Sequence, residues 1–294
     1  MISISGRVRS SAIAFNLKGR YMKLTLRLKN GTTDKGYISD SMLAELEKFI
    51  ADKMGYKSLS VITDEERVRN ILKNNAQLGV FKRDYKFENV KSYKIDYSKL
   101  TDDEEHSLDM VRRAYETDAH MYAMYFYVDT LGKVFPKEEF GMDFEPAELP
   151  ITFWTNDDYS LGHGGRVHVS EKYASIHVSL NSVSFNERIQ IAIRHELIHF
   201  ALWYVGLPNE DDTVEFYCLA SVLNANPYTS IDDKWKAYAD LFEEFANENL
   251  HDIPIDEAYR MLGKAIAAIS KSHSPEEYKA KLNDLVNEIK KLKK

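Results

Sequence analysis

The run ERIQIAIRHELIHFALWYVGL, residues 187–207, constrains the fold more than any other part of the chain. Apolar residues cover most of its helical surface, so the run predicts a largely buried helix. A capping box formed by Ser184 and Glu187 marks its start, and Gly206 marks its end. Ionisable groups at 194–196 and 199 interrupt the apolar run, so it is not a membrane span. A buried helix that carries such groups requires partners for them.

His195 and His199 are four residues apart on this helix. That spacing places both imidazoles on one face, about 6 Å apart along the axis. Both can therefore reach one zinc ion at about 2.0–2.1 Å. Glu196, beside the first histidine, can then take a proton from zinc-bound water, whose pKa falls to about 7. This H-E-x-x-H pattern is typical of zinc peptidases, and the alternative is two histidines at helical spacing without a metal.

A catalytic zinc needs a third protein ligand and an open position for water. The metzincin pattern would place Gly at 202 and His at 205, and Leu202 and Val205 exclude that class. The turn at Gly206 can bring the start of the next helix under the metal. Asp212 and Glu215 lie there, one helical turn apart, and either side chain could be the ligand.

The stretch from this helix to D-T-V-E-F resembles the SprT-like zincins over about residues 101–225. The family pattern is H-E-x-x-H, a short gap, then H-G-x-E-[WF]. Asp212 stands where the family has histidine, and Thr213 stands where it has glycine. The resemblance implies that Asp212 is the third ligand and that Glu215 and Phe216 support the helix. It also implies proteolysis, which the best-known members direct at proteins crosslinked to DNA.

The charge is divided unevenly along the chain. Residues 1–100 carry 20 basic and 11 acidic residues, whereas residues 101–294 carry 19 and 35. The basic residues of the first strands alternate with aromatic ones such as Tyr21. That pattern predicts either a nucleic-acid face or a solvated sheet surface.

We therefore predict an α+β protein in three parts. Residues 1–100 form a basic α+β domain that recruits a substrate or nucleic acid. Residues 101–228 form a zincin-like catalytic domain, with a long helix from Thr101, three short strands and the H-E-x-x-H helix. Residues 229–294 are helical. Alternating apolar and polar residues predict strands over residues 3–15 and 21–31, with a hairpin turn at Asn30-Gly31. Ser274 and Pro275 predict the start of the last helix.

The single cysteine, Cys218, excludes an intrachain disulfide and a cysteine-rich zinc site. No signal peptide or membrane span is evident, so we expect a cytoplasmic protein with no membrane partner. The predicted function is a zinc metallopeptidase (cofactor Zn²⁺) with protein or peptide substrates, including DNA-associated proteins. The alternative is a non-catalytic protein that binds nucleic acid or protein on a zincin scaffold.

Overall fold

The structure is a computed structural model with an α+β fold. It describes residues 21–78, 80–81, 83–145, 149, 151–154, 165–169, 174–179, 187–225 and 231–293. Three sequence-based expectations lie outside these residues: the strand within residues 1–20, the cap at Ser184 and the boundary at 228.

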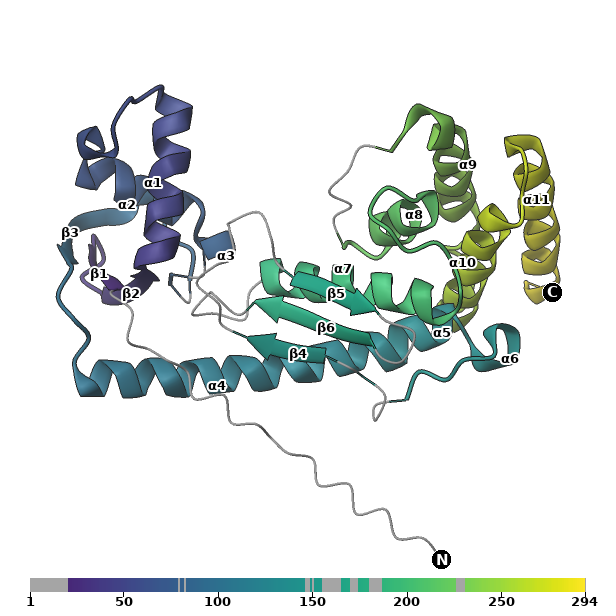
Figure 1. The fold of residues 1–294 in the computed structure, drawn as a ribbon, viewed down its shortest axis with the longest axis horizontal. Coiled ribbons are helices and arrows are strands. Elements are labelled where there is room, and N and C mark those ends of the chain that lie inside the picture. The colour runs from purple at the N-terminus through teal and green to yellow at the C-terminus, as the bar shows by residue number, and fades with distance from the viewer. Residues whose placement is uncertain are drawn as a thin grey trace, which may run out of the picture.

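The N-terminal part is an antiparallel sheet covered on one face by helices (Figure 1). Its elements are β1 (Tyr21–Leu28), β2 (Thr33–Ser39), α1 (Asp40–Met54), η1 (Leu59–Val61), α2 (Asp64–Lys73), α3 (Asn75–Leu78), η2 (Phe87–Asn89) and β3 (Val90–Asp96). The strand order is β2-β1-β3. Met22, Leu24 and Leu26 are fully buried against the helices, because alternate residues of a strand share one face. The predicted turn at Asn30-Gly31 joins β1 to β2, with Gly31 at φ 88°.

The central part places a second sheet against two long helices (Figure 1). Its elements are α4 (Asp102–Tyr125), the π-helical turn η3 (Phe126–Leu131), α5 (Gly132–Val134), α6 (Lys137–Phe140), β4 (Ile151–Trp154), β5 (Gly165–Val169), β6 (Ala174–Ser179) and α7 (Glu187–Tyr204). The strand order is β4-β6-β5, with β4 parallel and β5 antiparallel to β6. Helix α7 contacts β5 and β6, and α4 contacts α7 and β4. The long helix and the three strands predicted for this region are confirmed.

Within the described residues, four helices follow α7 (Figure 1). They are α8 (Val214–Val222), α9 (Asp233–Asn249), α10 (Ile255–Ser270) and α11 (Pro275–Leu292). The start predicted for the last one is confirmed, since the Ser274 side chain accepts from the backbone N–H of Glu277 and Pro275 is the first helical residue. Arg260 of α10 forms ion pairs with Glu139 of α6 and Glu288 of α11, so charge as well as apolar contact joins these helices.

Buried apolar residues form two clusters. One lies within the N-terminal part, from Met22 to Phe81. The other runs from Ala119 to Ile289 and includes residues of α4, α7 and all four final helices. The helix that carries the two histidines is therefore packed in the same core as the C-terminal helices. Within the described ranges, none of the helices combines the length and apolar character needed to cross a bilayer.

Gly263 provides a test of the packing between α10 and α5. A Cβ at this position would lie 1.8 Å from the carbonyl oxygen of Val134. We expect Gly263→Ala to lower the free energy of unfolding by about 1–3 kcal/mol through overpacking. On an open helix surface the same change would raise it by about 1 kcal/mol.

Urea denaturation measures this difference, with Gly132→Ala as the matched control. A Cβ at Gly132 would meet the Phe144 Cβ at 3.3 Å, so its cost is smaller. A Gly263→Ala protein as stable as the parent would contradict the packing described for this contact.

Candidate metal centre

Helix α7 carries three ionisable side chains into the protein interior. His195 and Glu196 are 5% and 6% exposed, and His199 is half-buried. Burial of such groups costs free energy unless hydrogen bonds or ions compensate for it. The surroundings of the two imidazoles show how this cost is met.

The chain turns back sharply after α7. Gly206 adopts the left-handed conformation (φ 75°), and the N–H of Leu207 donates to the carbonyl of Leu202 at 2.8 Å. This is the Schellman ending that glycine permits, and it confirms the predicted helix end. The loop that follows brings the backbone carbonyl of Asn209 to His199. The Nδ1 atom of His199 and this carbonyl form a hydrogen bond.

A second turn supports His195 in the same way. After α8, Asn224 adopts a left-handed conformation (φ 53°), and the next carbonyl, that of Ala225, lies 3.3 Å from His195 Nδ1. Arg194 Nε donates to the Asn224 carbonyl at 2.9 Å, and Arg194 Nη1 donates to the Tyr122 hydroxyl at 2.6 Å. Arg194 and His195 of α7 thus contact the consecutive carbonyls of Asn224 and Ala225. Tyr122 of α4 accepts a hydrogen bond from Arg194 and so links α4 to this arrangement.

These two carbonyl contacts favour one tautomer of each imidazole. A carbonyl oxygen can only accept, so the proton of each neutral ring is on Nδ1 and each Nε2 carries a lone pair. The two Nε2 atoms face each other at 3.1 Å. Asp211 Oδ1 lies 3.3 Å from each of them. Three acceptor atoms therefore converge on one point.

The separations among these atoms fit a metal ion. Ligand atoms bound at about 2.0–2.1 Å in tetrahedral geometry lie about 3.3 Å from one another. The observed 3.1, 3.3 and 3.3 Å are close to that value. A cation at the centre would satisfy all three acceptors at once, so His195, His199 and Asp211 form a group that can hold a metal ion.

The third member of this group differs from the sequence-based expectation, which was Asp212. Within the described residues the metal-competent group contains Asp211, and Asp212 is exposed outside it. The reason is a tight turn in which both the N–H and the hydroxyl of Thr213 donate to the Glu210 carbonyl, at 3.0 and 2.7 Å. Consecutive side chains of a turn point in different directions, and Asp211 is the one beside the histidines.

Glu215, the other candidate for third ligand, is engaged elsewhere. It is buried on α8, and its carboxylate accepts a hydrogen bond of 2.5 Å from the Ser270 hydroxyl of α10. Burial raises the pKa of Glu215, and the bond from Ser270 opposes that rise. Glu215 thus connects α8 to the C-terminal helices and is not part of the metal-competent group.

Phe216 fixes the orientation of both imidazoles. Its ring stacks on His199 with centroids 3.8 Å apart and planes 2° apart, and it meets His195 edge-on at 4.9 Å. The resemblance assigned Phe216 only to support of the helix. The contributions of Asn209 and Ala225 were missed altogether, because a backbone carbonyl leaves no signal in residue type.

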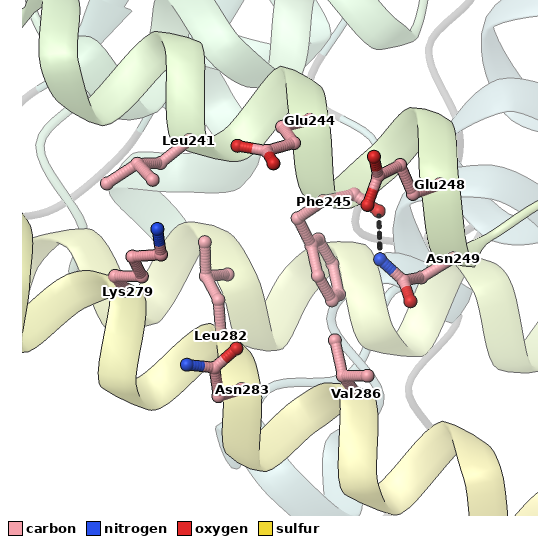
Figure 2. Close-up of a pocket in the computed structure, with 9 residues that line it drawn as sticks. All are labelled: Leu241, Glu244, Phe245, Glu248, Asn249, Lys279, Leu282, Asn283 and Val286. Atoms are coloured by element: carbon pink, nitrogen blue, oxygen red, sulfur yellow. Dashed lines mark hydrogen bonds between the residues drawn. The ribbon is translucent and has the colours of Figure 1, made fainter.

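Figure 2 shows a separate hollow between α9 and α11, with a volume of about 90 Å³. Leu241, Phe245, Leu282 and Val286 give it apolar walls, and no residue of the metal-competent group lines it. Its volume is well below the roughly 300 Å³ at which small-molecule sites begin. We assign no chemistry to it.

No protein-family model, curated protein or solved structure matches this chain.

The choice between the two neighbouring aspartates can be tested directly. We expect Asp211→Ala to weaken zinc affinity by more than about 100-fold, because it removes one of three ligands, a larger change than the loss of an outer-shell partner. Asp212→Ala removes the same charge one residue away and should leave the affinity nearly unchanged. Competition with a chromophoric chelator measures both dissociation constants. Equal losses in the two variants would refute the assignment of Asp211.

A second test asks whether Phe216 orients the two imidazoles or only fills space in the core. We expect Phe216→Leu to weaken zinc affinity about tenfold, as the loss of an outer-shell contact does. The control is Phe242→Leu, since Phe242 is equally buried but lies on α9. Both variants should lose similar stability on denaturation. If both also lose zinc affinity to the same extent, Phe216 has only a general packing role.

Proposed function

We propose that the chain is a zinc-dependent metallopeptidase with a zincin-like core, in which His195, His199 and Asp211 hold the metal. The observation that carries this proposal is the convergence of His195 Nε2, His199 Nε2 and Asp211 Oδ1. Glu196, the residue after His195 on α7, is buried. The resemblance to SprT-like zincins supports the same activity.

The ligand set favours zinc. Two imidazole nitrogens and one carboxylate oxygen are donors that zinc accepts, and three protein ligands with one open position are typical of catalytic zinc sites. When bound, zinc would act as a Lewis acid that lowers the pKa of water and polarises a carbonyl. The Asp211 side chain is 54% exposed, so the site is reachable from solvent.

Glu196 is the residue that we assign to proton transfer. Its carboxylate would accept a proton from the water whose oxygen attacks the peptide carbonyl carbon. As the C–N bond breaks, the same carboxyl would deliver that proton to the departing nitrogen. With their Nδ1 protons donated to the carbonyls of Ala225 and Asn209, His195 and His199 would hold the metal through Nε2.

The substrates follow from the resemblance rather than from the site. Protein or peptide chains are the general class, and DNA-associated proteins are the narrower class that the SprT-like pattern implies. A cleavage assay should therefore include an unstructured protein such as casein, self-cleavage, and a DNA-bound protein.

The deciding experiment exchanges Glu196 for glutamine. We expect Glu196→Gln to keep one zinc per chain and to lose cleavage by about 10²–10⁴-fold, the usual contribution of a positioned acid–base group. His199→Ala should lose both zinc and cleavage. Metal analysis of the purified protein and a casein cleavage rate are the two measurements.

Glu187→Gln is the matched control, because Glu187 lies exposed on the same helix. It should change neither zinc content nor cleavage. Cleavage by Glu196→Gln at the parent rate would exclude the peptidase mechanism, and metal-free parent protein that takes up no zinc would exclude the metal centre itself.

A further inference from the structure

On one face the N-terminal sheet packs against helices of its own part. Within the described residues the opposite face contacts α4 at one end, where Lys23 pairs with Glu104, and is otherwise open. Residues of β1 alternate between these faces, so Met22, Leu24 and Leu26 enter the core while Lys23, Thr25 and Arg27 lie on the other side. The register of the two ladders determines which side chains of β2 and β3 stand beside them.

The open face is a regular array of cations and hydroxyls. Thr25 is paired with Lys35 on β2 and Lys94 on β3. In the next row, Arg27 is paired with Thr33 and Ser92. Five of these six residues are exposed and Thr25 is half-buried. The two rows thus hold three cations and three hydroxyls, with no carboxylate and no large apolar side chain. We call these six residues the sheet face.

Several cations near the sheet face already have carboxylate partners. Lys23, one row further along, is neutralised by Glu104 at 2.6 Å. On the helices, Arg67 and Arg69 likewise have glutamate partners. In contrast, Arg27, Lys35 and Lys94 form no ion pair within the part of the chain that the structure describes. Their charge is available to a partner.

We infer that the sheet face binds the phosphate backbone of a single-stranded nucleic acid. Lysine, arginine, serine and threonine side chains are the groups that contact phosphate oxygens. An acidic protein or an anionic membrane would also be attracted, but stable contact with either requires apolar residues at the centre of the surface. The sheet face has none.

The dimensions of the sheet suit one strand rather than a duplex. Neighbouring β-strands lie about 4.8 Å apart, so Lys35 and Lys94 flank Thr25 at a separation of about 10 Å. A flat surface of this width can follow one backbone, whereas a duplex groove is entered by a protruding helix or ribbon. Residues 1–20, which lead directly into β1, add four basic residues and no acid to the same part of the sequence.

The experiment compares two triple variants of the full chain. The first, Arg27→Gln with Lys35→Gln and Lys94→Gln, removes the cations of the sheet face. The second, Lys48→Gln with Lys57→Gln and Lys73→Gln, removes three exposed lysines in and near α1 and α2. Fluorescence anisotropy of a labelled oligothymidine of about 20 nucleotides measures the dissociation constant at rising salt.

We expect the first variant to bind at least about tenfold more weakly at low salt, and its log–log salt slope to fall by about 2, the value for three phosphate contacts on a single strand. The second variant should resemble the parent. Glu196→Gln should also bind like the parent, because this inference does not depend on the proposed peptidase activity. Circular dichroism establishes that both triple variants are folded.

Three results would overturn the inference. The first is a parent protein that does not bind the oligonucleotide at low salt. The second is an equal loss of affinity in the two triple variants, which would indicate diffuse charge. The third is preferential binding of vesicles rich in phosphatidylserine, or of polyglutamate, through the same three cations.

Discussion

Two hydrogen bonds to backbone carbonyls set the geometry of the metal-competent group. The Nδ1 protons of His199 and His195 are donated to the carbonyls of Asn209 and Ala225. Both Nε2 lone pairs therefore face the same point. Without those carbonyls either ring could turn or change tautomer, and the group would no longer be complementary to a cation. The turns at Gly206 and Asn224 that deliver the carbonyls are therefore as much a part of the site as the imidazoles.

The sequence predicted the parts of the site that depend on helical periodicity. His195, Glu196 and His199 lie on one buried helix because spacing and apolar pattern are local properties of the chain. It did not identify Asp211, since residues 210–212 are three consecutive acids in a turn, where no period distinguishes them. The turn bonds of Thr213 make that choice, and they follow from the three-dimensional course of the loop.

The fold was predictable to a similar extent. Alternating residues of β1 and the Asn30-Gly31 turn indicated the first hairpin. The acidic first turn after Thr101 indicated the long helix α4, and the Ser274-Pro275 start indicated the last helix. How the helices and strands pack against one another was not predicted, because the packing rests on contacts between residues distant in the sequence. Arg260 with Glu139 and Gly263 against Val134 are such contacts. Neither has a counterpart in local propensity.

Helix α4 connects the N-terminal sheet to the two histidines of α7. Near its start, Glu104 forms an ion pair with Lys23 of the N-terminal sheet. Near its end, Tyr122 accepts a hydrogen bond from Arg194, the residue before the first histidine. Eighteen residues of continuous helix separate these contacts, a rod of roughly 27 Å. A molecule bound at the sheet would therefore lie at a fixed distance from the histidines, because one continuous helix sets the spacing between the two regions.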